Sequence, residues 1–588
     1  MYGLLSSSKN CRKFIVTAFK SVNLFHHTAP DINEYEEAMK ALNSLQTNRA
    51  LLEELKKEAR TSHVTNIKKL QQTVTFLERS GVSLEKLDEL SVIHVSGTKG
   101  KGSTCAFCES ILRHHGYKTG FYSSPHLVAV RERIRINGQP LSQQEFSRYF
   151  WKVYNSLIEL RKTENDMPPY FRFLTVMAFN VFLSEKVDVA IVEVGIGGEY
   201  DCTNILRQVS TVGITSLGID HTSLLGSTIE DIAWQKAGIM KPGSIAFTAD
   251  QQPAAALEVL RQRASEKKST LLIAPPLESY DWSSFTTQLG TVAKVQLVNA
   301  SLAIQLANAW LWQHGSGGHP PADVALRREQ SRVSEEQVPV SPVFQVSFNM
   351  ASGLKFCTWP GRNQIISEGL VHYFLDGAHT SESLWLSIDW FIQNSHAISK
   401  KNTPYRVLIF NCTGDRDPKA LLLPLLDCDF QLVIFCPNTV TTSVDSSSDQ
   451  ANYKINMIQQ LENCRRIQEV WYELQEENVK NKTRFFNVLH PIYIRNNVPK
   501  NLLDSCNSVK SKAEVKLFPC VSETLAYLKK KNEDESCEFH IYITGSLHLI
   551  GCVLSVLDPD LTLATSQLSE GIGVSATNGT NMVESYSS

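Results

Sequence analysis

The segment at residues 91–104, SVIHVSGTKGKGST, limits the folds open to this chain more than any other stretch. Apolar and β-branched residues run into a turn with three glycines and two lysines, and apolar side chains at helical spacing follow the turn. A strand, a glycine loop and a helix in this order bind nucleotide phosphates, because the loop turns its backbone N–H groups inward and the helix N-terminus attracts anions. We expect Lys101 to reach the terminal phosphates and Ser103 or Thr104 to face magnesium.

The loop departs from the usual G-x-x-x-x-G-K-[ST] pattern of phosphate loops. Val95 stands where the pattern has its first glycine, and Gly102 separates Lys101 from the hydroxyl residue. A glycine turn with surface lysines is the alternative interpretation. The strand and helix patterns on either side favour the phosphate loop.

Composition restricts the class of protein. The chain has 588 residues, of which 42% are hydrophobic and 20% charged, and this is enough for two or three globular domains. Its net charge of −2 disfavours a nucleic-acid partner held by bulk electrostatics. No apolar run is long enough to predict a transmembrane segment. The 13 cysteines lack paired spacing, which favours reduced thiols over a disulfide framework.

The N-terminal segment has the composition of a targeting sequence. Residues 1–32 contain serines and four basic residues but no acidic residue before Asp31, so we predict a mitochondrial transit peptide. An N-terminal tail without a targeting role is the alternative. Initiation at Met39 would give a cytosolic form, and we therefore expect matrix and cytoplasmic forms that differ in their N-termini.

Strand and helix patterns alternate along the chain and predict two α/β domains. Helical patterns at 33–60 and 64–90 precede the first strand, and the apolar runs at 186–195 and 210–218 are typical of parallel strands covered on both faces. Ser227 and Glu230 have capping-box spacing and predict the start of a helix that ends at Gly238.

These patterns also predict where the domains begin and end. We expect an ATP-binding domain with a mostly parallel sheet at 33–340, with a polar loop at its end. A smaller Rossmann-like α/β domain is expected at 341–560, with a variable insertion at 440–535. Residues 561–588 are small and polar and predict a disordered tail.

Polar residues stand where the strands of the first domain end, which is the edge at which open parallel sheets bind ligands. Glu193 ends an almost wholly apolar strand, and its carboxylate suits Mg²⁺ beside a phosphate loop; a salt-bridged strand end is the alternative. Taken alone, His221 is more often exposed or hydrogen-bonded than a ligand. Taken alone, Lys236 is expected to be a solvated helix lysine.

Three further motifs carry charge. Arg131, Arg133 and Arg135 alternate along one face of a predicted strand, which would meet an anionic substrate or be a solvated edge. In the second domain, Arg362 lies in a Trp-Pro-Gly-Arg turn and Asp376 directly follows a strand. An arginine can stabilise a transferring phosphoryl group, and a strand-end aspartate can bind ribose hydroxyls.

A series of motifs runs in order from residue 91 to residue 557: GTKGKGST, YSSPHLVAVRERIRING, VEVGIGGEYDCTN, LGIDHTSLLG, AWQKAGI, WPGR, LDGAHT, TGDRDP and TGSLHLIG. With these motifs the chain resembles the animal-type folylpolyglutamate synthases of the Mur ligase superfamily. The resemblance implies an N-terminal P-loop ATPase domain and a smaller C-terminal α/β domain that closes over the nucleotide.

The resemblance also implies a reaction. L-Glutamate would be added in γ-linkage to reduced folates and folylpolyglutamates, through an acyl phosphate and with ATP and Mg²⁺, to retain folates for one-carbon metabolism. This is a tetrahydrofolate:L-glutamate γ-ligase (ADP-forming), expected to be a monomer, with K⁺ as a candidate monovalent cofactor.

Residue roles follow from the resemblance as well. The implied ATP-binding residues are Gly100, Lys101, Gly102, Ser103, Asn299, Arg362 and Asp376. The implied metal ligands are Ser124, Glu193 and His221. For His221 the resemblance thus replaces the interpretation as an exposed or hydrogen-bonded residue. Lys236 matches a position that is carbamylated in relatives and helps to hold a second metal. His379 would act near glutamate as a base for its amine, and Ser546 would contact substrate.

The chain departs from the family pattern at two positions. Two functions other than that of a folylpolyglutamate synthase are also considered. Thr380 and Ser381 follow His379 where relatives have Asn-Pro, and Gln296 ends a segment that replaces the Gly-x-His-Gln before Asn299, so adenine contact through Asn299 stays open. A dihydrofolate synthase is one alternative. A non-catalytic nucleotide-binding regulator is the other, and the retained metal ligands disfavour it.

Overall fold

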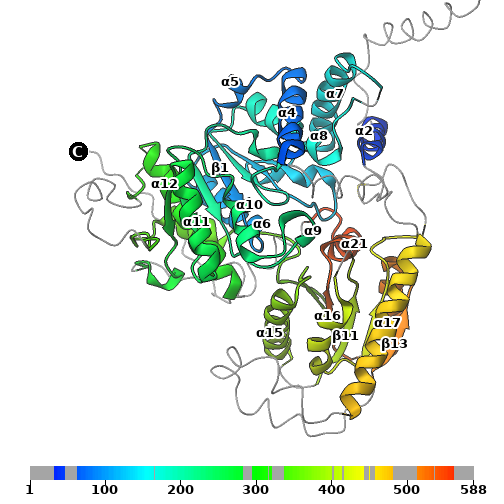
Figure 1. Cartoon of the computed structure of the whole chain (residues 1–588). Coiled ribbons are helices and arrows are strands. Elements are labelled where there is room, and N and C mark those ends of the chain that lie inside the picture. Colours follow the sequence, from blue (N-terminus) through cyan, green and yellow to red (C-terminus); the bar gives the residue numbers. More distant parts are fainter. Residues whose placement is uncertain are drawn as a thin grey trace, which may run out of the picture.

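The computed structural model describes residues 32–46, 63–164, 166–282, 294–315, 317–320, 337–399, 403–413, 416–442, 449, 457–480, 513–535 and 537–561. The predicted transit peptide up to residue 31 and the predicted tail from residue 562 lie outside these residues. The described residues form two α/β domains, each built around one mostly parallel sheet, which confirms the predicted fold class (Figure 1).

The first domain has an eight-stranded sheet in the order β4-β3-β2-β5-β1-β6-β7-β8. Its strands are β1 Val92–Ser96, β2 Thr119–Tyr122, β3 Ile134–Ile136, β4 Gln139–Pro140, β5 Val189–Glu193, β6 Thr211–Ile214, β7 Ile245–Thr248 and β8 Thr270–Ile273. Only the β2–β3 and β3–β4 pairs are antiparallel. β1 and β5 are buried along their whole length, which explains their continuous apolar sequences.

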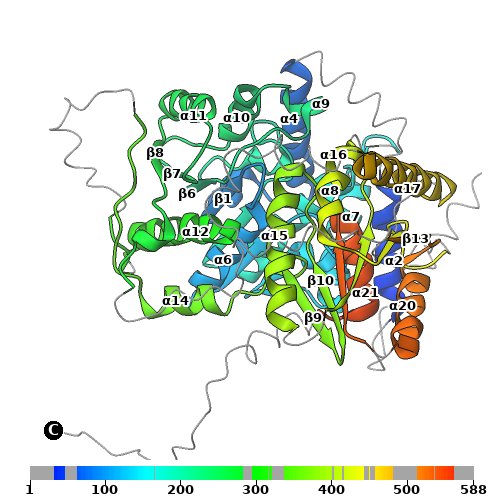
Figure 2. The ribbon, with the colours of Figure 1, turned by 90° about the horizontal axis from the view of Figure 1, so that it is seen from below.

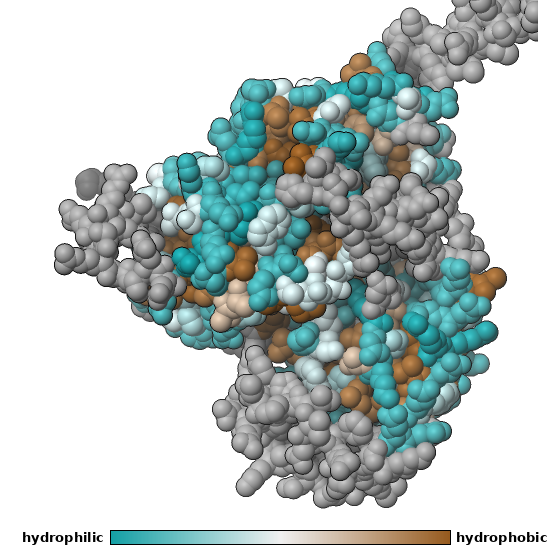
Figure 3. Space-filling view, in the orientation of Figure 1, coloured by the Kyte–Doolittle hydropathy of each residue, from teal (hydrophilic) through white to brown (hydrophobic). Residues whose placement is uncertain are grey.

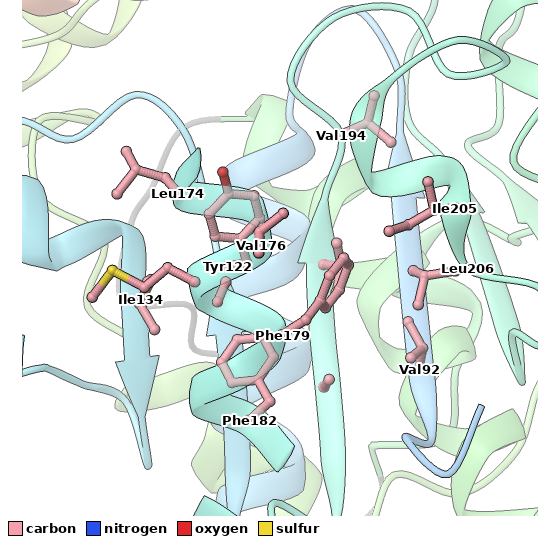
Figure 4. Close-up of a cluster of buried hydrophobic side chains, with 14 of the residues drawn as sticks. Val92, Tyr122, Ile134, Leu174, Val176, Phe179, Phe182, Val194, Ile205 and Leu206 are labelled. Carbon is pink, nitrogen blue, oxygen red and sulfur yellow. The ribbon is translucent and has the colours of Figure 1, made fainter. Parts of the chain in front are cut away.

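Helices cover both faces of this sheet. They are α2 Ile32–Ser44, α4 His63–Arg79, α5 Leu84–Leu87, α6 Lys101–His114, η1 Val130–Arg133, α7 Gln143–Glu159, α8 Tyr170–Glu185, η2 Cys202–Ile205, α9 Thr222–Leu225, α10 Ile229–Ala237, α11 Ala254–Lys267, η3 Leu277–Ser279, α12 Lys294–Gln313 and α14 Phe348–Lys355. On one face Phe179 and Phe182 of α8 pack over the central strands (Figure 4). On the other face α6 packs against α12 and α14.

The structure corrects three details of this domain. The predicted helix at 64–90 is divided into α4 and α5 by a turn at Gly81, whose φ is +91°. The capping box of α10 is formed by Thr228 and Asp231, one residue later than expected. α14 lies beyond the predicted boundary at 340, yet its residues pack in the core of the first domain.

The second domain has a six-stranded sheet in the order β13-β12-β11-β14-β10-β9, in which only β9 is antiparallel. Its elements are β9 Gln364–Glu368, β10 Val371–Leu375, α15 Ser381–Ile398, β11 Tyr405–Phe410, α16 Pro418–Leu422, η4 Leu423–Cys428, β12 Leu432–Phe435, α17 Met457–Lys480, β13 Glu514–Leu517, α20 Val521–Glu535, β14 Phe539–Thr544 and α21 Leu547–Leu557. α15 and α17 cover one face, and α20 and α21 the other (Figure 2).

Parts of the predicted insertion at 440–535 are built into this domain. β13 extends the sheet by pairing with β12, and Cys464 and Trp471 of α17 are buried in the core. The edge strand has the partly polar sequence EVKL, because an edge strand is covered less than a central one.

Among the described residues, two of the contacts between the domains involve Leu127 and Tyr35. Leu127 of the first domain packs in the core cluster of the second, where a Cβ on Gly551 would lie 2.1 Å from the Leu127 carbonyl oxygen. Tyr35 of α2 donates a 2.7 Å hydrogen bond from its hydroxyl to Asp449 Oδ1.

Two further observations concern the surface and the cysteines of the described residues. The face shown in Figure 3 is largely hydrophilic, and among the described residues no helix has the length and apolar character needed to cross a bilayer. Every cysteine in the described ranges is a free thiol.

Candidate active site

The predicted strand, glycine loop and helix are confirmed between β1 and α6. Gly97 has a φ of +144°, and a Cβ there would lie 1.8 Å from Thr215 Oγ1. Gly100 has a φ of +89°, and a Cβ there would lie 2.0 Å from Asn299 Oδ1. Because the loop is pressed against the end of β6 and against α12, only glycine fits at these two positions. The N-terminus of α6 begins at Lys101.

Two lysines converge on the loop. Lys101 Nζ and Lys236 Nζ donate to the Gly97 carbonyl oxygen at 3.1 and 2.7 Å. Lys236 is only 3% exposed, contrary to the solvated helix lysine expected from its local sequence. Burial, and then the charge of Lys101, holds the pKa of the Lys236 amine well below its usual value. Burial thus disfavours the charged form of the Lys236 amine.

Glu193 ends β5 beside the loop, as predicted. Its Oε2 accepts a 2.9 Å hydrogen bond from the Ser124 backbone N–H, and the residue is 4% exposed. Burial raises the pKa of the Glu193 carboxyl, against the nearby charges of Lys101 and Arg362. A buried carboxylate facing cations has the chemistry of a cation-binding site.

His221 and Thr104 lie at the margin of the same region. His221 is exposed at the start of α9 with a φ of +52°, and partial desolvation followed by nearby lysine charges lowers the pKa of its imidazole. Thr104 Oγ1, in the first turn of α6, is buried without a hydrogen-bond partner among the described residues. The oxygen atoms of Glu193, Ser124 and Thr104 fit the donor preferences of Mg²⁺.

A small, partly open pocket lies between the domains next to the loop. From the first domain it is lined by Gly102, Ser123, Ser124, Pro125, Leu127, Glu132, Arg135 and Glu193, and from the second by Trp359, Pro360, Arg362 and Leu547. A Cβ on Gly102 would lie 3.1 Å from the Trp359 ring. The Trp359 ring therefore packs close to the phosphate loop at the boundary of the two domains.

Asp376 and Arg362 form the second domain's part of the region. The Asp376 carboxylate accepts hydrogen bonds of 2.9 Å from the backbone N–H groups of Asn363 and Ala378. Burial raises the pKa of Asp376 and lowers that of Arg362, while the charge of each opposes the shift of the other. The aspartate thus fixes the turn that presents the arginine to the pocket.

A second cross-domain cluster, Lys99, Asp220 and His379, was missed by sequence reasoning, which assigned no role to Lys99. Lys99 Nζ lies 3.3 Å from Asp220 Oδ2 and 3.2 Å from His379 Nε2. Burial lowers the pKa of Lys99 to about 8 and that of His379 to about 4. The neutral imidazole donates from Nδ1 to Gly377 O, at 3.0 Å, so its Nε2 accepts from Lys99. The presence of Lys99 in the glycine loop, two residues before Lys101, was the signal that could have indicated this role.

The remaining predicted residues lie nearby but outside the pocket lining. Asn299 is buried against Gly100, and its Nδ2 donates to Gln296 Oε1 at 3.0 Å. Ser546 accepts a 3.1 Å hydrogen bond from Asn438, and the adjacent Gly545 N–H donates to Ala378 O, next to His379. Ser546 therefore lies beside the loop that carries His379.

The prediction of a basic strand at Arg131, Arg133 and Arg135 is wrong. Residues 130–133 form η1, and only Arg135 lies on a strand. The chain turns there because the Glu132 carboxylate accepts from the backbone N–H groups of residues 127, 128 and 129. Arg133 donates to His126, whereas Arg135 lines the pocket with its guanidinium over the Trp359 ring. The three side chains share no face.

A phosphate loop at the end of a parallel sheet, facing an arginine from a second α/β domain, defines a two-domain nucleotide-dependent ligase. No protein-family model matches the chain. The mitochondrial folylpolyglutamate synthase of Homo sapiens is 43% identical over 563 residues, covering 90% of this chain and 92% of the relative. That of Bos taurus is 42% identical, covering 91% and 94%. The chain belongs to the folylpolyglutamate synthase family.

Solved structures agree on the fold. The folylpolyglutamate synthase of Mycobacterium tuberculosis in complex with ADP has a TM-score of 0.61 at 18% identity, covering 90% of this chain and 99% of that one. FolC of Escherichia coli in complex with DHPP and ADP has a TM-score of 0.55 at 22% identity, covering 83% and 92%.

Proposed function

We propose that the pocket between the domains carries out the reaction of this family. The enzyme is an ATP-dependent ligase that adds L-glutamate to reduced folates and folylpolyglutamates in γ-linkage, forming ADP. One observation carries the assignment to this pocket: the phosphate loop, Glu193 and Arg362 come from separate segments and two domains, yet meet at one cavity.

The reaction needs an activated acid, because a free carboxylate has no good leaving group. Transfer of the ATP γ-phosphoryl group to the folate γ-carboxylate forms an acyl phosphate and breaks the bond to ADP. We assign Lys101 and Arg362 to neutralising charge on the transferring group. Attack by the neutral glutamate amine then forms the amide and releases phosphate. Closure of the domains excludes water, which would otherwise hydrolyse the acyl phosphate.

We assign ATP to the face of the phosphate loop. Gly100, Gly102 and Ser103 would present backbone N–H groups to the phosphates. The contact between Gly100 and Asn299 supports a place for Asn299 near the nucleotide. Asp376 keeps acceptor capacity beyond its two backbone hydrogen bonds, which suits ribose hydroxyls.

Mg²⁺ would be held by Ser124, Glu193 and His221, and when bound it would supply positive charge to the phosphates.

Lys236 is proposed to be carbamylated: its neutral Nζ adds to CO₂ and releases a proton, which gives a carboxylate suited to a second metal. Incubation with ¹³C-labelled CO₂ should give a carbamate carbon signal that is absent from Lys236→Arg. K⁺ is proposed as the monovalent cofactor, and replacement of K⁺ by Na⁺ tests it.

His379 and Ser546 are assigned to the glutamate end of the site. A pKa of about 4 makes His379 a weak base, and its Nε2 already accepts from Lys99. We therefore favour a positioning role in which the imidazole holds Lys99 and Asp220 in place. Ser546 adjoins the His379 loop, which supports contact with substrate.

We propose that the enzyme acts as a monomer in the mitochondrial matrix and in the cytoplasm. The basic, acid-free composition of residues 1–30 and the mitochondrial names of the human and bovine relatives support the first location. Alternative N-termini would supply the second. All proposed groups belong to one chain, which supports a monomer.

The reaction is tested with tetrahydrofolate, ATP-Mg and isotope-labelled glutamate, followed by mass analysis. We expect products heavier by whole glutamyl units and phosphate release that requires folate and glutamate. EDTA should stop both. Phosphate release independent of folate would overturn the assignment, and glutamate addition to dihydropteroate would indicate a dihydrofolate synthase activity.

A further inference from the structure

A cluster of metal-binding side chains lies far from the pocket, on the second domain's sheet. His372 and His540 are cross-strand partners on β10 and β14, and Glu538 precedes His540 by two residues, on the same face. One ligand atom from each residue lies within 4.8 Å of the others. Asp376 follows the opposite end of β10, so the cluster is about 13 Å along the strand from the active-site region.

The three side chains lie close enough together to share a cation. Glu538 Oε1 lies 3.4 Å from His372 Nε2 and 3.3 Å from His540 Nε2. These distances exceed the usual range of about 2.7–3.2 Å for N–H···O bonds. Ligands about 2.0–2.1 Å from a tetrahedral zinc ion are about 3.3–3.4 Å from each other. Both separations are therefore compatible with neighbouring zinc ligands as well as with long hydrogen bonds.

Serines orient both imidazoles. His372 Nδ1 lies 2.8 Å from Ser367 Oγ, and His540 Nδ1 lies 2.7 Å from Ser395 Oγ. When each Nδ1–H donates to its serine, the lone pairs of both Nε2 atoms point at the Glu538 carboxylate, and a cation is needed among them. Metal-binding histidines in proteins are commonly held in this way by their other ring nitrogen.

The surroundings add negative potential. Ser395 lies in the last turn of α15 and Ser399 is its C-cap, so the negative end of the helix dipole faces the cluster. Ser399 Oγ donates to Glu538 Oε2 at 2.9 Å. Arg406 opposes a cation from the next strand, but its guanidinium donates to Cys428 O and lies over the Phe391 ring.

We propose that His372, Glu538 and His540 form a zinc site that ties β10, β14 and the end of α15 together. Two imidazoles and one carboxylate suit Zn²⁺, whereas Mg²⁺ prefers oxygen ligands alone. Three protein ligands leave a fourth position for water. We assign the bound zinc to stabilising the strands whose opposite ends lead to Asp376 and Ser546, because the cluster lies at the end of β10 away from the active-site region.

The test uses the full chain, freed of metal by a chelator and then given Mg²⁺ and a non-hydrolysable ATP analogue to fill the active site. Zn²⁺ is titrated against a chromogenic chelator. We expect the wild type to bind one equivalent more than His372→Gln and Glu538→Gln, and His396→Gln, an exposed histidine of the same helix α15, to bind as the wild type does. Zn²⁺ should also raise the Tm of the wild type and of His396→Gln only.

The test replaces His372 and Glu538, which are partly exposed, and leaves His540 in place. His540 is fully buried, so its replacement would be more damaging to the fold. Circular dichroism identifies a variant that has lost its fold, and the other variant then decides the outcome. Co²⁺ in place of Zn²⁺ should give tetrahedral absorption bands in the wild type that both rim variants lack. Equal Zn²⁺ stoichiometry and affinity in all four proteins would overturn the proposal.

Discussion

At the scale of single residues, burial sets the charge state of the groups around the phosphate loop. Lys101 and Lys236 share the Gly97 carbonyl oxygen, and the proximity of two amines helps to keep Lys236 neutral. Glu193 and Asp376 are buried carboxyls next to cations. Burial and neighbouring charges thus shift the pKa values of these groups, as is typical of sites that bind charged ligands.

Lys101→Ala should lower kcat by about 100- to 1,000-fold, because it removes a preorganised charge from the transferring phosphoryl group. The fold should persist, since the side chain is only partly buried and makes one hydrogen bond, to Gly97 O. Folate-dependent phosphate release measures the effect. Lys152→Ala, at an exposed position of α7, is the matched control and should be unaffected. Near-normal turnover of Lys101→Ala would refute the role.

The pKa of Lys99, about 8, predicts an alkaline fall in activity. As the pH rises through 8, Lys99 loses its proton and with it the ion pair to Asp220, so kcat/KM should drop by about fivefold, equivalent to about 1 kcal/mol. In Lys99→Arg the guanidinium stays charged, and the drop should disappear.

Lys241 provides the control for this pH profile, because burial also lowers its pKa to about 8. It contacts Asn204 O, away from His379. Lys241→Arg should keep the alkaline fall. If Lys241→Arg removes the fall and Lys99→Arg does not, the assignment to Lys99 is wrong.

At the scale of elements, the central strands were predictable and the edges were not. β1, β5 and β10 carry apolar runs because both faces of the sheets are covered, and the sequence between β1 and α6 leaves few alternatives. β13 is partly exposed, and its polar–apolar alternation extends over only four residues, which is the shortest run that indicates a strand.

The sequence predicted those site residues that lie in a short motif next to a strand, and not those that depend on contacts between distant segments. Lys101, Glu193 and Asp376 each follow a strand, whereas the Lys99–His379 contact joins residues 280 positions apart and depends on the docking of two domains. The turn at η1 depends on Glu132 collecting three backbone N–H groups, which overrides the alternation of the arginines.

The cap of α10 gives a prediction at this scale. Thr228 Oγ1 accepts from the Asp231 N–H at 3.1 Å, so Thr228→Ala should lower the free energy of unfolding by about 1 kcal/mol. Ser227→Ala, at the adjacent exposed position that the sequence pattern had favoured, should change it little. Denaturant unfolding compares the two. A larger loss for Ser227→Ala would contradict the structural assignment of the cap.

At the scale of the whole molecule, specific contacts on either side of the small pocket join the two domains. Leu127 packs in the second domain's core, Lys99 connects the phosphate loop to His379, and Tyr35 reaches Asp449. Domain opening would break the Lys99 contact, so product release and the state of the phosphate loop are coupled.

Tyr35→Phe should lower the free energy of unfolding by about 1 kcal/mol, because a partly buried carboxylate loses one of its donors. Thermal unfolding measures the change. Tyr154→Phe is the control, since Tyr154 lies in the same aromatic region of the first domain and its hydroxyl has no hydrogen-bond partner among the described residues. Equal Tm values for the two variants would argue against a stabilising Tyr35–Asp449 contact.

The position of Met39 gives the choice of start codon a physical consequence. Met39 is fully buried in the middle of α2, and Tyr35 lies one turn before it. A chain whose synthesis begins at Met39 lacks that turn and the tyrosine that anchors the helix to Asp449. If translation also begins at Met39, as proposed above, the shorter protein would be less stable and would be degraded faster in the cell than protein made from an upstream codon.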